Sequence, residues 1–352
     1  MWLTLLSFFA VLIVLVLAHE IGHFATARIF KVKVEEFGIG FPPRLFGIKR
    51  RDTIYSLNAV PLGGFVKMAG EEDPDVAGSL ASKKTGVRIT VLAAGALMNA
   101  LLPLLLFSIA FIVPHNVLVG KVLVQEIAPG SPASQTDMVV GDAIIAIDGK
   151  PVRSTVDVNR YIQLNLGRMV DIKLEHVDGA VETVSAVPRW QPPEGQGATG
   201  IRVAMGDASV VREALPFWRA IPMGVKECLE TFVLFKNAII SMIIGTAPVI
   251  IAGPVGVAQL TGEVAKAGIS PLLEFAAFFS INLAIINLFP LPALDGGRIV
   301  FVVLEWLRRG KRVSPKVEGM IHTIGFFLLI GAILLVTYQD ILRITTGGSL
   351  IP

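Results

Sequence analysis

Residues 15–30 read LVLAHEIGHFATARIF, which places two histidines and a glutamate inside an apolar segment. The whole apolar run, about 2–30, exceeds the roughly 20 residues that a helix needs to cross a bilayer. Ionisable side chains at that depth cost on the order of 2.5–3.5 kcal/mol each. The segment therefore predicts a membrane span in which His19, Glu20 and His23 have a function.

Three further apolar stretches follow, at 89–113, 271–307 and 324–338, and Pro290 and Pro292 interrupt the second of them. The chain is 53% hydrophobic and only 17% charged, whereas soluble domains are about 25% charged. We therefore expect a polytopic α-helical membrane protein with about four transmembrane helices, which has the lipid bilayer as a partner. The net charge of +3 comes largely from basic residues beside the apolar segments. These residues indicate topology, so no nucleic-acid partner is expected.

The patterns of polarity and turn residues divide the chain into four parts. Residues 1–116 hold the first two spans and, at about 35–68, a β-hairpin that we expect to be membrane-associated. Short apolar runs that alternate with Pro-Gly and Asp-Gly turns predict one soluble α+β domain over 117–205. Residues 206–267 favour an interfacial or re-entrant helical region. Residues 268–352 hold the third and fourth spans.

Two basic loops set the expected orientation. Residues 49–51 lie between the first two spans and 308–316 between the last two, so both loops should be cytoplasmic. The soluble domain is then extracytoplasmic. His19 comes late in a span that enters from outside, which puts it towards the cytoplasmic side. Asp295 reaches the same depth only if residues 226–252 cross the membrane zero or two times.

The motif H-E-x-x-H carries the chemistry. Histidines four residues apart project from one face of a helix, so His19 and His23 can bind one zinc ion at about 2.0–2.1 Å. Glu20 is then placed to act on a water at the metal. Metal binding also explains why these polar groups are tolerated in an apolar span.

A catalytic zinc usually takes three protein ligands and leaves one position for water. Asp295 is a candidate for the third ligand, because Gly296 and the next glycine permit a close approach. Asp295 could also cap a helix that starts at Gly296. His322 is a competing ligand, which we interpret as an interfacial histidine.

These motifs together resemble the site-2 proteases, which are intramembrane zinc metalloproteases, and in particular the bacterial regulator-of-sigma-E protease type. The resemblance covers essentially the whole chain. It rests on HEIGH (19–23), GFPPRLFG (40–47), PLGGFVKM (61–68), the G-x-x-x-N spacing of Gly95 and Asn99, and NLFPLPALDGG (287–297).

The resemblance implies one Zn²⁺ per chain, held by His19, His23 and Asp295, with Glu20 as the general base. It implies cleavage of the transmembrane segments of single-pass membrane proteins, such as anti-sigma factors or signal-peptide remnants, in the bacterial inner membrane. Further residues would lie near an extended substrate: Asn287, Pro290, Pro292 and, with a less defined role, Asn99.

The soluble domain resembles a PDZ domain in APGSPA (128–133), VGDAIIAIDGKPV (140–152) and TGIRV (199–203). That resemblance implies a groove for a peptide carboxyl terminus, lined by Gly200, Ile201, Arg202 and Val203. A spacer without a peptide site is the alternative, and only one such domain fits where some members of the family have two.

Three other functions fit parts of the sequence. An inert membrane adaptor would use only the PDZ-like domain, but the intact HEIGH and LDGG motifs argue against it. A cation-pathway transporter would use the same buried charges, but it leaves Glu20 without a task. A soluble-type zinc peptidase tethered by a helix would place its motif outside the apolar run.

Overall fold

The computed structural model describes residues 2–71, 73–247 and 252–346. These residues form two compact units. The first unit holds the described parts of 1–110, 220–224 and 251–352, and the second holds those of 111–219 and 225–250. Each unit is described by itself below.

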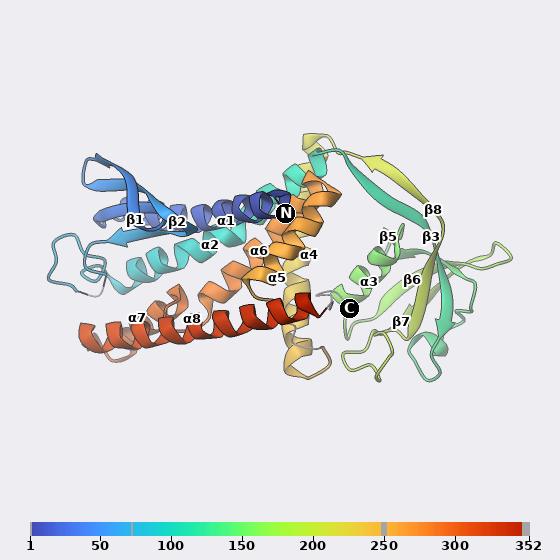
Figure 1. The fold of residues 1–352 in the computed structure, drawn as a ribbon. Coiled ribbons are helices and arrows are strands. Elements are labelled where there is room, and N and C mark those ends of the chain that lie inside the picture. Colours follow the sequence, from blue (N-terminus) through green and yellow to red (C-terminus); the bar gives the residue numbers. More distant parts are fainter. Residues whose placement is uncertain (1, 72, 248–251, 347–352) are drawn as a thin grey trace. The chain divides into compact units, whose positions relative to one another are not determined.

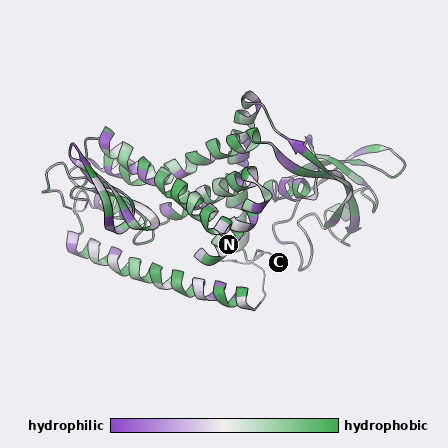
Figure 2. Cartoon of the chain, turned by 45° about the horizontal axis from the view of Figure 1, so that its top comes forward, coloured by the Kyte–Doolittle hydropathy of each residue, from purple (hydrophilic) through white to green (hydrophobic). Residues whose placement is uncertain are grey.

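Four helices are long and apolar enough to cross a membrane among the residues described: α1 (Trp2–Ile29), α2 (Thr85–Ile112), α6 (Ile269–Leu288) and α8 (Pro315–Thr345). Two shorter helices complete the helical part of the first unit, α5 (Pro254–Ala267) and α7 (Asp295–Leu307). In Figure 2 these helices are coloured mostly as hydrophobic along their length, as expected of segments that lie in a bilayer. The structure thus has the four long apolar helices that the sequence predicts.

A long hairpin connects α1 to α2 (Figure 1). Its strands are β1 (Val34–Arg50) and β2 (Thr53–Met68), and Arg51 has a φ of 56° in the turn between them. The hairpin folds back on itself, so that residues 36–39 pair with 54–57 on one side and with 64–67 on the other. Among the strand pairings described, 64–67 has no second partner strand. This segment is therefore an edge that could accept another strand.

The hairpin is fixed to α1 and α2 by a buried apolar cluster. Val34 and Val66 of the hairpin pack there with Ala27 of α1 and with Val91 of α2. Other apolar side chains of the hairpin are exposed, namely Phe41, Leu45, Phe46, Ile48, Leu57 and Val60. Exposed apolar side chains in one element are a feature of surfaces that meet a membrane or a partner.

The second unit is built on an antiparallel sheet with the strand order β7-β6-β4-β3-β8, to which β5 adds by pairing with β4. The strands are β3 (His115–Ile127), β4 (Ala143–Ile147), β5 (Lys150–Pro151), β6 (Val170–Glu175), β7 (Val181–Ala186) and β8 (Ile201–Glu213). A short 3₁₀ helix, η1 (Ala133–Gln135), precedes β4, and α3 (Thr155–Leu164) follows β5. Strand β8 lies at one edge of the sheet and pairs with β3 over its whole length, from Ile127 opposite Ile201 to His115 opposite Glu213.

Alternating side chains of this sheet form the core of the second unit. Val170, Ile172 and Leu174 alternate along β6 and are fully buried, as is Ile144 of β4. This period of two is the one expected for a sheet with one buried face. Helix α3 covers that face, and the Ser154 hydroxyl caps it by accepting the Asp157 N–H at 3.2 Å.

Helix α4 (Phe217–Ile243) lies within residues 206–267, for which we expect an interfacial or re-entrant path. It is not among the membrane-crossing candidates of the described chain. Its polar side chains hold it to the PDZ-like part: Glu230 accepts from the ammonium group of Lys150 at 2.9 Å, and the Asn237 amide donates to the Gln163 carbonyl at 2.7 Å. Residues 248–251, which belong to the same predicted segment, lie outside the described residues.

Candidate metal centre

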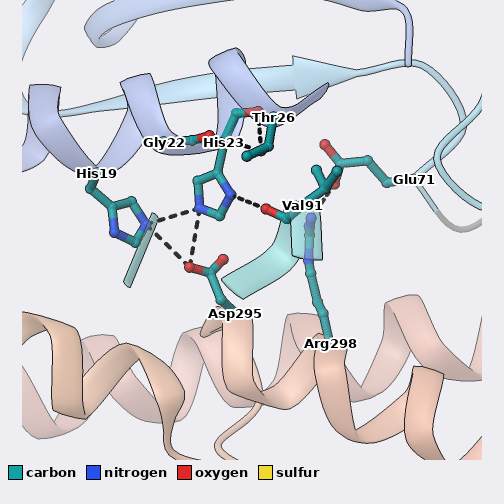
Figure 3. Close-up of polar contacts among 8 residues, drawn as sticks. All are labelled: His19, Gly22, His23, Thr26, Glu71, Val91, Asp295 and Arg298. Carbon is teal, nitrogen blue, oxygen red and sulfur yellow. Dashed lines mark hydrogen bonds and ion pairs between the residues drawn. The ribbon is translucent and has the colours of Figure 1, made fainter. Parts of the chain in front are cut away.

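Helix α1 positions two imidazoles over one turn. The Nε2 atoms of His19 and His23 lie 3.1 Å apart, because residues four apart are neighbours on the same helix face. Both rings are mostly buried. Figure 3 shows the two rings converging on Asp295, which comes from α7.

The carboxylate reaches the imidazoles because α6 ends at Leu288 and the chain turns before α7. The Oδ2 atom of Asp295 lies 3.2 Å from Nε2 of His19 and 3.2 Å from Nε2 of His23. One correction concerns the helix start: α7 begins at Asp295, its N-cap is Leu294, and no side chain caps it. Asp295 therefore does not cap a helix that starts at Gly296, and its carboxylate is directed at the histidines instead.

Glycines provide the space for this convergence. A Cβ atom on Gly95 of α2 would lie 2.3 Å from Nε2 of His23 and 2.7 Å from Nε2 of His19. A Cβ atom on Gly297 would lie 2.2 Å from the Leu291 carbonyl oxygen. These distances are well below any tolerable contact, so a side chain at either position would displace the ligands or the turn that carries Asp295.

Helix α2 also orients one ligand. The Nδ1 atom of His23 lies 2.8 Å from the Val91 carbonyl oxygen, so Nδ1 must carry the proton that makes this hydrogen bond. In the neutral ring, Nε2 is then left with its lone pair directed at Asp295. A hydrogen bond from the far ring nitrogen to a carbonyl is the usual way to orient a metal-binding histidine.

The donor set fits zinc. Ligand atoms at about 2.0–2.2 Å in a tetrahedron lie roughly 3.3–3.6 Å apart, and the three observed separations are 3.1, 3.2 and 3.2 Å. Two imidazole nitrogens and a carboxylate oxygen are ligands that zinc prefers. Three acceptor atoms packed this closely are stabilised when they share a cation. Among the described residues, this is the one group of three or more such side chains close enough to hold a metal ion.

A cavity of about 810 Å³ opens on the metal-binding atoms. Its lining includes His19, Glu20, His23 and Asp295, together with residues 65–68 of β2. The rest of the wall comes from β1, α2, α7, α8 and the loops after β2 and before α7. Its residues are Phe41, Glu71, Leu92, Ala293, Arg298, Gly319, His322, Thr323, Phe326 and Phe327. Glu20 thus faces the same cavity as the three ligands. It lies next to Gly64 of β2: a Cβ atom on Gly64 would be 3.2 Å from Cγ of Glu20.

The other predicted residues of this site lie outside the cavity wall. Among the residues described, Asn287, Pro290, Pro292 and Asn99 are not part of its lining. Asn287 lies at the end of α6. Pro292 packs against α8, because a Cβ atom on Gly325 of α8 would lie 2.2 Å from Cβ of Pro292. Asn99 is fully buried in α2, and neither polar atom of its side chain has a partner among the described residues.

The predicted peptide-binding residues of the second unit begin the edge strand β8. The Gly200 N–H is already used by the Gly197 carbonyl at 3.0 Å, and Gly200 has a φ of 77°. Ile201 and Val203 pack against the core of the unit, and Arg202 forms an exposed ion pair with Glu126. The arrangement leaves the outer edge of β8 for a peptide strand and commits the Gly200 amide to the turn.

One polar feature of the cavity is absent from the sequence-based prediction. Glu71 and Arg298 form an ion pair that links the loop after β2 to α7, visible in Figure 3. The order of the residues gives no signal for this pair, because it depends on which faces meet in the folded unit. His322, named from the sequence as a competing ligand, lies in the wall formed by α8 and is not in the group of side chains that could hold a metal ion.

Comparison with known proteins agrees with this geometry. Residues 7–332 match the family described as Peptidase family M50. A relative from Clostridium acetobutylicum, provisionally named a zinc metalloprotease, is 35% identical over an alignment of 347 residues, which covers 96% of this chain and 98% of the relative. Zinc metalloprotease RasP of Geobacillus kaustophilus is 29% identical, over 96% of this chain and 97% of its own length.

Among solved structures, the PDZ domain of an SdrC-like protein from Listeria innocua is similar, with 26% identity. The match covers 24% of this chain and 96% of that structure, with a TM-score of 0.22.

Apolar helices that enclose an H-E-x-x-H pair and a distant aspartate define a membrane-embedded metalloprotease. The chain belongs to Peptidase family M50, the site-2 proteases, and it is a bacterial zinc metalloendopeptidase.

Proposed function

We propose that this protein cleaves single-pass membrane proteins within their transmembrane segments, in regulated intramembrane proteolysis. Anti-sigma factors and signal-peptide remnants are the expected substrates. The proposal rests on one observation: the Nε2 atoms of His19 and His23, the Oδ2 atom of Asp295 and the side chain of Glu20 all face one cavity between apolar helices.

The proposed roles follow from the chemistry of the side chains. His19, His23 and Asp295 hold one zinc ion per chain, which, when bound, activates a water molecule and polarises the scissile carbonyl. Glu20 accepts the proton of the attacking water and delivers it to the leaving amine. Val91 keeps the His23 ring in the orientation that directs Nε2 at the site.

The substrate must be extended before it can be cut, because the peptide bonds of a helix are shielded by their own hydrogen bonds. Residues 64–67 of β2 offer an open strand edge, and residues 65–68 line the cavity. Pairing of a substrate strand with this edge satisfies backbone groups on both partners. It would also lay the chain along the wall that carries the metal ligands.

The arrangement in the cell is part of the proposal. The active site lies towards the cytoplasmic side of the inner membrane, and the PDZ-like domain is extracytoplasmic. Residues 1–116, 117–205, 206–267 and 268–352 act as four functional parts. The PDZ-like domain either excludes substrates with bulky external domains or binds a newly formed carboxyl end.

A cleavage assay with metal analysis tests the proposal. The full chain, purified in detergent, should contain zinc and cut a single-pass model substrate. Glu20→Gln should keep its zinc and lose cleavage, whereas Glu263→Gln, on the exposed surface of α5, should behave as wild type. Wild-type cleavage by Glu20→Gln would refute the base assignment, and cleavage in the absence of any bound metal would refute the site.

A comparison of membrane peptides identifies the substrates. Peptides that accumulate in cells carrying Glu20→Gln and not in wild-type cells should derive from single-pass membrane proteins. Accumulation of soluble proteins alone would point to a different substrate class.

A further inference from the structure

His322 lies in the cavity wall and has an unused polar atom. The residue is only 9% exposed, and it lines the cavity that also holds Glu20 and Asp295. Its Nδ1 atom accepts a hydrogen bond from the Ala293 N–H at 3.0 Å. Its Nε2 atom is buried and has no hydrogen-bond partner among the described residues.

The partner of Nδ1 determines which ring nitrogen carries the proton. A neutral imidazole has one donor and one acceptor nitrogen. Because the Ala293 N–H donates to Nδ1, the proton is on Nε2, and Nε2 is an N–H donor without an acceptor among the described residues. A buried donor left without a partner costs free energy, so this N–H should be satisfied in some other state of the protein.

The position of His322 shows which groups can reach it. Gly319, His322, Thr323 and Phe326 all line the cavity, and their spacing of three, four and seven residues puts them on one face of α8. Ala293, which holds the ring, is two residues from the ligand Asp295 and has a φ of 72°. The ring thus lines the same cavity as the metal-binding atoms, and the proposed function brings a substrate carbonyl group into that cavity.

We propose that the Nε2–H of His322 donates a hydrogen bond to the scissile carbonyl oxygen of the substrate and stabilises the negative charge that develops there. The inference rests on the proposed proteolytic function. No covalent bond forms to His322, and its proton stays on the ring. The role is that of a donor placed where charge develops, which is among the largest contributions to catalysis in acyl transfer.

Two substitutions separate the donor from the loop anchor. His322→Asn places an oxygen near the Nδ1 position and can still accept the Ala293 N–H, but it has no group at the Nε2 position. His322→Gln places an amide N–H near the Nε2 position and lacks an acceptor at the Nδ1 position. We expect His322→Asn to lower kcat by about 10²-fold, with KM and zinc content close to wild type. His322→Gln should keep kcat within about tenfold of wild type.

The same assay distinguishes the possible failures. A wild-type kcat for His322→Asn would overturn the inference, as would a loss confined to KM. Loss of zinc from both variants would assign His322 to support of the Asp295 loop and would also overturn it. If wild type cleaves and Glu20→Gln does not, the proposed function stands whatever His322 does. If wild type does not cleave any substrate, both proposals fail together.

Discussion

The metal centre and the PDZ-like domain are held together in different ways. At the metal centre, the fit depends on empty space at Gly95 and on particular atoms such as the Val91 carbonyl. In the PDZ-like domain, apolar side chains such as Ile144 and Ile172 fill a common core. The first region should therefore be most sensitive to added volume, while the second should be most sensitive to lost volume.

Gly95→Ala is expected to have the largest effect. The new Cβ atom would lie 2.3 Å from Nε2 of His23, so the imidazoles must move apart. We expect zinc affinity to fall by at least the roughly 10–100-fold typical of changes next to metal ligands, and cleavage to fall with it. Gly86→Ala on the same helix is the matched control, because its Cβ atom would meet nothing within 4 Å. Equal zinc titrations for the two variants would contradict the role of Gly95.

Ile144→Ala tests the other region. Ile144 is 1% exposed, and truncation of a buried isoleucine costs about 2–5 kcal/mol. The PDZ-like domain should open more often, which proteolysis of residues 111–219 in the full chain would measure, while the zinc content stays unchanged. Val156→Ala is the control, since Val156 is 71% exposed. Loss of zinc from Ile144→Ala would show that the two regions are coupled.

Glu230→Gln should have a smaller effect. Glu230 accepts from Lys150 and also pairs with Arg160, and these contacts lower the pKa of its carboxyl group although burial opposes them. We expect a loss of about 1 kcal/mol or less, because all three side chains keep some solvent contact. Release of α4 from the PDZ-like domain would be detected by hydrogen exchange. Lys121→Gln breaks the exposed pair with Glu175 and should change nothing measurable.

The smallest expected effect is a pH dependence at His176. Hydrogen bonds to Asp142 and Glu182 raise the pKa of this imidazole. The folded state therefore favours the protonated ring, and this stabilisation is complete below the unfolded pKa of about 6.5. It is lost as the pH rises through the higher folded pKa. As the pH is raised above about 6.5, the urea midpoint of the domain should decrease more in wild type than in His176→Gln. If the urea midpoints of wild type and His176→Gln change equally with pH, the role of His176 is refuted.

The sequence predicts those features that depend on local spacing. The interval between His19 and His23 predicts two imidazoles on one helix face, and their Nε2 atoms lie 3.1 Å apart. The alternation in the segment before Glu175 predicts a strand, and β6 has that period. Asp295 lies 272 residues after His23 in the chain. Its contact with the two histidines could therefore be predicted chiefly from the resemblance to a protein family.

Other features depend on tertiary contacts that leave no local signal. The Val91 carbonyl that orients His23 is a backbone atom, and any residue type would supply it. The double pairing of residues 36–39 arises because the hairpin is long enough to fold back. Helix α7 starts at Asp295, whereas a capping role for Asp295 would require a start at Gly296. This start follows from the tight turn that the next two glycines permit. The position of His322 depends on the close packing of Gly325 against Pro292.

The pairing of His115 with Glu213 has a consequence for how such a chain can change. The first and last strands of the PDZ-like domain end side by side, so the chain enters and leaves this domain at neighbouring positions. Modules with adjacent ends can be removed, exchanged or doubled with little disturbance of their host. A chain that joins residue 114 directly to residue 214 should therefore keep its zinc, and it would report what the protease does without its external module.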